Sequence, residues 1–166
     1  EDNQYRLNPE ISLWVDSEAF QAAYKAGQQL EQAGQLPEAI SEYQVAESLY
    51  QGKFLAEDIY EDWPTIQREH LKLAHLDILN RLSQHYFEQG EIMMSTTFCQ
   101  KLLAEDNCRE DAHRRLMRCY LHQGQRHLAL RQYHLCVEAL DQELDVPPMP
   151  ATTELYRQIQ EDPSQL

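Results

Sequence analysis

A five-residue segment that recurs at a regular interval is the feature that most constrains how this chain can fold. The segment Tyr86–Gly90 reads YFEQG and the segment Tyr120–Gly124 reads YLHQG. Their glycines are about 34 residues apart, a spacing typical of proteins that stack one supersecondary unit after another. A looser copy, LEQAG, ends at Gly34, which precedes Gly90 by one such period and an insertion.

The residues around each glycine indicate that the repeating unit is a helical hairpin. Glycine tolerates the left-handed backbone conformation that ends a helix, so each of these glycines is expected between two antiparallel helices. Before each glycine, apolar or small residues recur at i, i+3, i+4 and i+7, the spacing of one buried helix face. They are Ala23, Ala26, Gly27 and Leu30, then Leu79, Leu82, Ser83 and Tyr86, then His113, Leu116, Met117 and Tyr120.

The second helix of each hairpin should present small and large residues in turn to the first. Ala39, Tyr43 and Ala46 fit this pattern, as do Ala129, Tyr133 and Cys136, whereas Ser95, Cys99 and Leu102 fit it less well. The interval between Gly90 and Gly124 is also the period of tetratricopeptide repeats (TPR). We therefore predict an all-α fold, a TPR-like right-handed solenoid of about three helical hairpins with a C-terminal capping helix.

Helix-capping residues and prolines place the helix ends. Asp16 or Ser17 should cap a first helix that runs to about residue 33, and Pro37 should stand in the first turn of a second helix that runs to about residue 50. Asp58 and Glu61 have the spacing of a capping box for a long helix to residue 89, with a kink expected at Pro64. Further helices are expected at about residues 91–104, 109–123, 125–144 and 151–159.

The charge distribution limits the partners of the chain. The net charge is −14, and residues 1–62 and 136–166 are strongly acidic, with 13 acidic against 3 basic and 7 acidic against 1 basic side chains. An acidic surface repels phosphate backbones, so DNA is expected to be contacted only by a domain outside this chain. No apolar stretch approaches the roughly 20 residues of a membrane helix, and nothing at the start reads as a signal peptide. We expect a cytoplasmic protein.

The histidines and cysteines of the last third raise the question of a metal site. Cys119 and His122 are three residues apart on one predicted helix, but His113 and Cys136 fall on core positions of different helices. A zinc site needs about four converging ligands, so packed thiols and surface imidazoles are the expected outcome, with no metal. The sequence has no glycine-rich phosphate loop and its carboxylates are scattered. We therefore expect no cofactor, no catalytic residue and no enzyme activity.

A groove is a better candidate for a functional site. In a stack of hairpins, the inner helices line a concave surface and their non-core positions face into it. Those positions hold Tyr24 and Gln28, then Asn80, Gln84 and Phe87, then Arg114, Arg118 and His122. An arginine fork matches a carboxylate or a phosphate. Two interpretations remain open: Arg114 and Arg118 bind a partner or ligand, or they pair with neighbouring acids such as Glu110 and Asp111.

Several segments together resemble a known family. They are LYQGKFL at 49–55, YEDW at 60–63, REDAHRRLMR at 109–118, ALRQY at 129–133, ELDVP at 143–147 and LY at 155–156. This combination is similar to the bacterial transcriptional activator domain (BTAD) of SARP-type, antibiotic-regulatory transcriptional regulators, over about residues 12–160. In that family, a winged-helix DNA-binding domain precedes this one and often ends in Gly-Tyr-Arg-Leu. The triplet Tyr5-Arg6-Leu7 matches that ending, so residues 1–11 are expected to be the end of a preceding domain or a linker, and residues 161–166 a tail.

The resemblance implies a role in transcription activation through protein contacts, with self, RNA polymerase or a regulatory partner. Our leading hypothesis is a regulatory protein–protein interaction and oligomerisation module that acts with an upstream DNA-binding domain absent from this chain. The alternative is a sensor of a small anionic molecule, such as a nucleotide, that binds in the groove. A scaffold unconnected to transcription fits the repeat but not the family segments.

Overall fold

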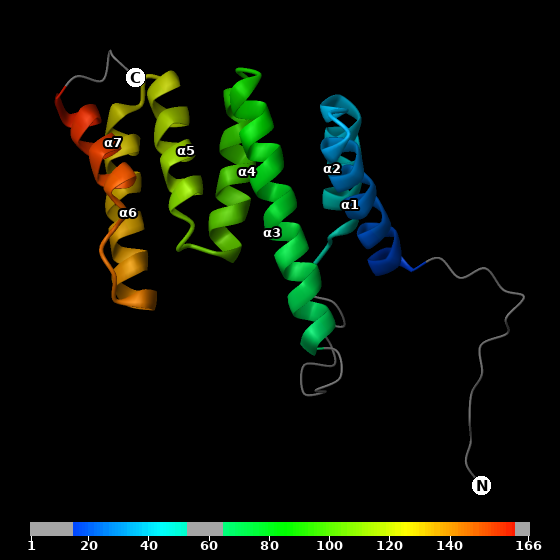
Figure 1. Cartoon of the computed structure of the whole chain (residues 1–166). Coiled ribbons are helices and arrows are strands. Elements are labelled where there is room, and N and C mark those ends of the chain that lie inside the picture. Colours follow the sequence, from blue (N-terminus) through cyan, green and yellow to red (C-terminus); the bar gives the residue numbers. More distant parts are fainter. Residues whose placement is uncertain (1–14, 53–64, 162–166) are drawn as a thin grey trace, which may run out of the picture. The chain divides into compact units, whose positions relative to one another are not determined.

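A computed structural model describes residues 15–52 and 65–161, and most of these residues lie in helices (Figure 1). The helices are α1 (Asp16–Gln32), α2 (Leu36–Leu49), α3 (Thr65–Glu88), α4 (Ile92–Glu105), α5 (Glu110–His122), α6 (Arg126–Leu144) and α7 (Pro150–Glu161). The described residues contain no strand, which confirms the all-α prediction. The chain divides into two compact units, Glu1–Leu71 and Lys72–Leu166.

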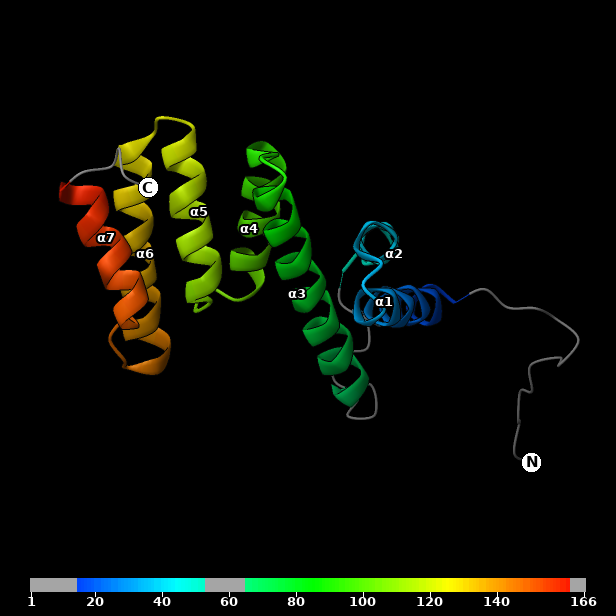
Figure 2. The same cartoon turned by 45° about the horizontal axis from the view of Figure 1, so that its top comes forward.

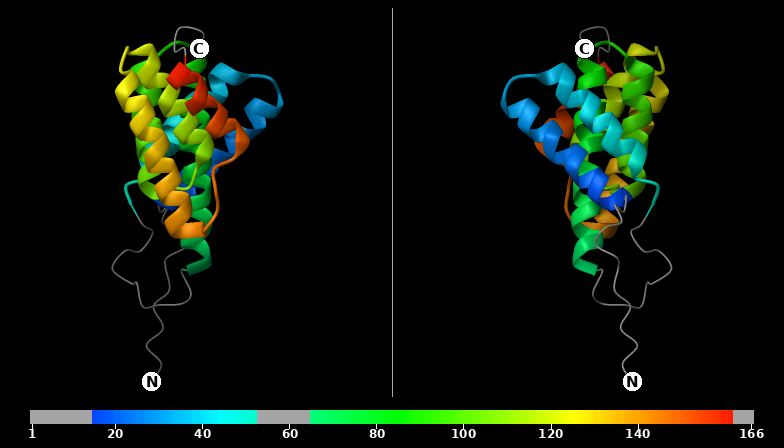
Figure 3. Two further views of the ribbon diagram at one scale, coloured as in Figure 1. Left: turned by 90° about the vertical axis from the view of Figure 1, so that its left-hand side faces the viewer. Right: turned by 90° about the vertical axis from the view of Figure 1, so that its right-hand side faces the viewer.

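The first unit contains a helical hairpin in which α1 and α2 are joined by a short turn (Figure 3). The two helices approach closely at Gly27, because a Cβ atom there would lie 2.5 Å from a ring carbon of Tyr43. Tyr43 is fully buried, and its hydroxyl donates a hydrogen bond of 2.9 Å to Glu31. Phe20 and Ala23 of α1 and Ala39 of α2 are buried in the same unit. The small residues predicted for the inner face of α1 therefore include its contact point with α2.

The second unit is a stack of helices in chain order. Neighbouring helices from α4 to α7 contact one another (Figures 1 and 2). Contact between α3 and α4 includes stacked rings of Tyr86 and Phe98, whose centroids are 5.5 Å apart. The core consists of side chains from each helix of the stack, among them Ile78, Leu79, Leu82, Cys99, Leu102, Leu116, Met117, Cys136, Leu155 and Ile159. The predicted helix ends from α4 onward agree with the structure to within about two residues.

The α4 side chains pack more closely than the sequence predicts. Ser95, Cys99 and Leu102 of α4 fit the packing pattern less well in sequence, yet all three are fully buried. The Ser95 hydroxyl donates to the carbonyl of Ser83 at 2.9 Å and lies 3.4 Å from the Cys119 thiol. A small hydroxyl side chain can enter the core when its polar atom has a partner there.

The three repeat glycines end their helices in the same way. Gly34, Gly90 and Gly124 have φ values of +76°, +75° and +71°, as the sequence predicts. In each turn, the amide one residue after the glycine donates to a carbonyl five residues earlier, which is the six-to-one bond of a Schellman motif. These bonds are Gln35 to Leu30 at 2.9 Å, Glu91 to Tyr86 at 2.9 Å and Gln125 to Tyr120 at 2.8 Å. The repeat seen in the sequence is therefore a repeat of backbone geometry.

The final helix, α7, is held at both ends. At its start, the Glu110 carboxylate of α5 accepts hydrogen bonds from the Met149 amide at 2.9 and 3.1 Å and from the Thr152 hydroxyl at 2.5 Å. At its end, the Arg126 guanidinium donates to the carbonyls of Ile159 and Gln160 at 3.0 and 2.8 Å. A carboxylate at the first turn and a cation at the last carbonyls both complement the helix dipole. The predicted C-terminal helix is thus fastened to α5 and α6.

Helix α1 begins at Asp16, after Val15, without a side-chain cap, although the Asp16 carboxylate accepts the Ser17 amide at 2.7 Å. The predicted capping box at Asp58 and Glu61, the kink at Pro64 and the segment 1–11 lie outside the described residues. So does the predicted tail 161–166, except for Glu161, which ends α7. Among the helices described, none has the length and apolar character needed to cross a lipid bilayer.

Candidate functional site

A hollow of about 260 Å³ opens between α3 and α5 in the second unit. Two of its lining residues, Gln84 and Phe87, lie on α3, and the other four, Asp111, Arg114, Arg115 and Arg118, lie on α5. Gln84, Phe87, Arg114 and Arg118 are groove positions expected from the sequence, and the structure brings these four side chains together. Asp111 and Arg115 complete the lining.

Arg115 is the most extensively hydrogen-bonded of the three arginines. Its side chain is only 9% exposed, and its guanidinium donates to the Gln84 carbonyl oxygen at 3.0 and 2.7 Å. It also donates to Asn80 at 2.9 Å and to Ser83 at 2.8 Å. All of these acceptors are neutral, so they satisfy the N–H groups without neutralising the charge. A buried guanidinium held by amides and a hydroxyl leaves a positive potential in the hollow.

Arg118 lies one helical turn after Arg114 on α5, and its side chain is exposed. In the part of the chain that the structure describes, it has no hydrogen-bond or ion-pair partner. Partial desolvation and the nearby positive charges of Arg114 and Arg115 lower the pKa of Arg118 below its ordinary value. The ordinary pKa of an arginine side chain is so far above neutral pH that the Arg118 guanidinium stays charged despite this lowering. Three like charges therefore meet on one side of this hollow.

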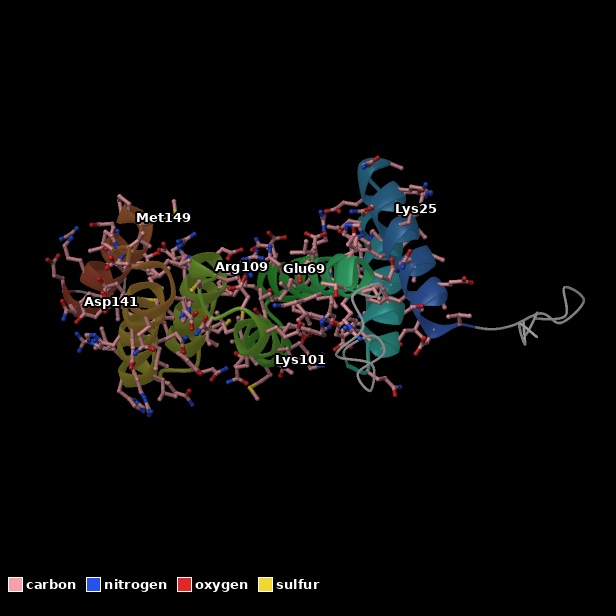
Figure 4. The ribbon with its side chains drawn as sticks, turned by 90° about the horizontal axis from the view of Figure 1, so that it is seen from below. Lys25, Glu69, Lys101, Arg109, Asp141 and Met149 are labelled. Carbon is pink, nitrogen blue, oxygen red and sulfur yellow. The ribbon has the colours of Figure 1, made fainter. Side chains whose placement is uncertain are left out.

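The acidic residues near these arginines are engaged elsewhere. Asp111 accepts two hydrogen bonds from Arg109, at 3.0 and 2.9 Å, and Arg109 is at the start of α5 (labelled in Figure 4). Burial alone would raise the pKa of Asp111, but its hydrogen bonds and charge pairing with Arg109 outweigh burial and lower that pKa. Of the two pairings considered from sequence, Arg114 is 3.8 Å from Glu110, but Asp111 is bonded to Arg109 rather than to Arg118.

Arg114 has a structural contact as well as a place in the hollow. Its Nη1 atom donates to the Thr152 hydroxyl at 2.7 Å, and Thr152 in turn donates to Glu110. Arg114 therefore belongs to the network that fastens α7 to α5. This contact makes Arg118, rather than Arg114, the guanidinium of the hollow whose donors are available.

The other predicted groove residues divide between the two units. Asn80 holds Arg115, and the His122 ring meets the Phe87 ring edge-on, with centroids 5.6 Å apart and an interplanar angle of 74°. The six predicted residues of the second unit thus form one neighbourhood. Tyr24 and Gln28 belong to α1 in the first unit, where both are half-buried and the Tyr24 ring centroid is 6.3 Å from that of Tyr43. Their role in a groove stays a prediction.

The histidine predicted for the core, His113, is buried and hydrogen-bonded at both ring nitrogens. His113 is 3% exposed, with Nε2 2.9 Å from the Asn107 carbonyl and Nδ1 2.7 Å from the Gln132 amide nitrogen. These contacts fix the tautomer with the proton on Nε2, and burial lowers the pKa of His113.

All four cysteines carry free thiols. Burial raises the pKa of Cys99 to about 11 and that of Cys136 to about 12, so both are protonated and poorly nucleophilic at neutral pH. Across residues 15–52 and 65–161, no three histidine, cysteine or acidic side chains are grouped as metal ligands.

The family model described as "bacterial transcriptional activator domain" matches residues 15–160, which is most of the chain. The chain belongs to the bacterial transcriptional activator domain family. This match confirms the resemblance found in the sequence, and the family name places this BTAD in transcription regulation.

A solved structure confirms the fold of the BTAD. The C-terminal TPR-containing domain of a putative FK506-binding protein from Plasmodium falciparum is similar, with a TM-score of 0.61 over 88% of this chain and 91% of that one. The two sequences are 16% identical, so the likeness concerns the fold alone. No curated protein matches the chain. A TPR-like stack of hairpins suits the BTAD to protein interaction.

Asp111 and Arg115 line the hollow but were not predicted from the sequence as site residues, and Asp111 was considered only as an ion-pair partner. Arg115 is the more informative omission. It shares a helix face with Ala112 and Cys119, three residues before and four after, and both of these are buried. A basic residue at a core spacing is the only signal that the sequence offers for it, because its partners Asn80, Ser83 and Gln84 lie on another helix and are known from the structure alone.

Proposed function

We propose that this BTAD is a regulatory protein-interaction and oligomerisation module of a bacterial transcriptional regulator. The observation that carries the proposal is the family match over residues 15–160, and the hairpin stack supports it because such stacks expose long continuous surfaces. The partner would be a second copy, RNA polymerase or another regulatory protein. DNA would be contacted by a domain outside residues 1–166, since this chain carries a net charge of −14.

Exposed apolar side chains supply candidate contact points for such a partner. Leu144, Val146 and Met149 are exposed within six residues where α6 passes into α7, and Met93 and Met94 are exposed at the start of α4. Apolar side chains, methionine among them, are typical of the centre of protein interfaces. Two highly acidic chains repel one another, so self-association would depend on apolar contacts of this kind.

The test is a pair of binding measurements on the full chain. Sedimentation velocity over a range of concentrations should show a concentration-dependent dimer or larger species, and immobilised chain should retain purified RNA polymerase or its isolated subunits. Val146→Asp should weaken the contact, whereas the neighbouring exposed change Gln142→Asp should not. A chain that stays monomeric at every concentration contradicts oligomerisation, and a chain that retains no polymerase subunit contradicts RNA polymerase as the partner.

The position of the domain within a larger regulator is a separate proposal. Residues 1–11, which contain Tyr5-Arg6-Leu7, would be the end of a preceding winged-helix domain or a linker, and residues 161–166 a tail. Reading the gene upstream of the codon for Glu1 tests this directly. A winged-helix reading frame that continues into residue 1 supports the proposal, and a frame that encodes an unrelated domain contradicts it.

A second candidate function is a sensor of a small anion. The observation that favours it is the hollow between α3 and α5. There, Arg118 has no partner among the described residues, and Arg115 is held by neutral groups. A ligand bound there would bridge α3 and α5. Thermal unfolding with and without added anions tests this role, because a ligand of the native state at about 100 times its dissociation constant stabilises it by roughly 2.7 kcal/mol.

A further inference from the structure

We propose that the hollow between α3 and α5 binds the phosphoryl group of a small phosphate monoester, with the organic part of the ligand against Phe87. The proposal rests on the sensor function and names its ligand class; it does not depend on the protein-interaction function. Arg118 supplies the hydrogen-bond donors, Arg115 supplies fixed positive charge, and Gln84 and Phe87 form the wall on α3.

The charge of the lining favours a dianion. Three guanidinium groups line the hollow, and its one carboxylate, that of Asp111, is bonded to Arg109. Arg114 has a further acid, Glu110, at 3.8 Å, but that carboxylate also accepts the Met149 amide and the Thr152 hydroxyl. A single carboxylate from a ligand would leave positive charge uncompensated, whereas a phosphoryl group carries close to two charges and three acceptor oxygens at neutral pH.

The site is organised before any ligand binds. The four hydrogen bonds of Arg115 to Gln84, Asn80 and Ser83 fix its guanidinium against α3, and Gln84 also donates to Glu88. Arg118 is the exposed arginine of the hollow, so its side chain is the one whose freedom ligand binding would chiefly restrict. Groups held in place in this way lose little conformational entropy on binding, which favours affinity in a small polar site.

The size of the hollow and its aromatic wall limit the rest of the ligand. A volume of about 260 Å³ lies just below the range of roughly 300–1,000 Å³ typical of pockets for drug-sized molecules. There is room for a phosphoryl group and a small organic group. Phe87 is half-buried, with the His122 ring edge-on to it, so one flat apolar surface lies beside the arginines. This arrangement selects for a ligand with an apolar or aromatic group next to its phosphate.

The experiment is a titration of the full ¹⁵N-labelled chain followed by NMR at constant ionic strength. The probes are phenyl phosphate, inorganic phosphate and benzoate, and the spectra report arginine Nε–H and backbone amide shifts. Phenyl phosphate should bind in a saturable way with shifts centred on α5 and the end of α3. Inorganic phosphate should bind more weakly because it lacks contact with Phe87, and benzoate more weakly because it carries one charge.

Arg118→Ala is the main variant because the side chain is exposed and its loss leaves the core intact. It should weaken phenyl phosphate binding about ten- to hundredfold, the effect of removing a charge-assisted hydrogen-bonding group. The affinity of Arg118→Lys for phenyl phosphate should lie between that of the unaltered chain and that of Arg118→Ala, since lysine keeps the charge but lacks the guanidinium fork. The matched control is Arg131→Ala, an exposed arginine of α6, which should bind as the unaltered chain does.

Four results would overturn the proposal. The first three are no saturable shift with phenyl phosphate, unchanged affinity in Arg118→Ala, and equal loss in Arg131→Ala, which would indicate only general charge attraction. Benzoate that binds as tightly as phenyl phosphate would show that the ligand class is a carboxylate and not a phosphate monoester. None of these results bears on the sedimentation and polymerase-retention measurements, so the two proposed functions can fail separately.

Discussion

The substitution Gly27→Ala tests the packing of the first hairpin most sharply. A Cβ atom at this position would lie 2.5 and 2.7 Å from two ring carbons of Tyr43. That ring is fully buried and its hydroxyl is bound to Glu31, so it cannot swing aside without losing contacts. Overpacking of this kind costs about 1–3 kcal/mol, whereas replacing glycine by alanine inside a helix gains about 0.5–1 kcal/mol. We expect Gly27→Ala to destabilise the hairpin by about 1–2 kcal/mol.

Amide hydrogen exchange read by mass spectrometry is the appropriate assay because it reports each unit of the chain separately. Protection of α1 and α2 should fall in Gly27→Ala, while that of α5 and α6 should not change, since these helices belong to the other unit. In a Tyr43→Leu background the same change should cost less, because the smaller side chain leaves room for the new methyl group. Increased protection of α1 in Gly27→Ala would refute the argument, because helix propensity would then outweigh the contact.

Three further predictions follow from the second unit. Burial lowers the pKa of His113, so the stability that the neutral ring contributes is fully present above the unfolded-state pKa of about 6.5 and is lost as the pH falls below that value. The free energy of unfolding measured in urea should therefore decline from pH 7.5 to 5.5, and this decline should be smaller in His113→Asn. Arg126→Ala removes two hydrogen bonds to the last carbonyls of α7. Hydrogen exchange should become faster in α7 alone, by an amount equivalent to about 1–2 kcal/mol. Unchanged exchange in α7 would contradict this account. A thiol reagent such as DTNB should modify Cys108 first and the three buried cysteines only on unfolding, and a second thiol that reacts rapidly in the native protein would be the contrary result.

The helices of this protein were predictable because the signals that place them are local. The left-handed glycines Gly34, Gly90 and Gly124 end their helices through nearby residues alone, and the structure has hairpin turns at all three. The environment of Ser95 depends on a carbonyl of another helix, that of Ser83, and sequence periodicity alone therefore underestimated how well it packs.

The candidate site was predictable only in part, for the same reason. Arg114 and Arg118 stand one turn apart on one helix, so their shared face is evident from the sequence. Arg115 gains its place from Asn80, Ser83 and Gln84, which lie more than thirty residues earlier, and no local pattern reveals that pairing. The destination of a charged side chain depends on the helix that packs opposite it, which is tertiary information.

The Schellman turns have a consequence for how this domain can vary in evolution. Within each hairpin, the six-to-one bond fixes the number of residues between the helices, so an insertion there would break the bond and change the angle at which the helices meet. Among the described residues, no six-to-one bond closes the four-residue connection between α4 and α5, and fifteen residues separate α2 from α3 in the sequence. The extra residues between Gly34 and Gly90 include this longer connection. Changes in length should therefore accumulate between hairpins, where new binding segments can be added without altering the hairpins themselves.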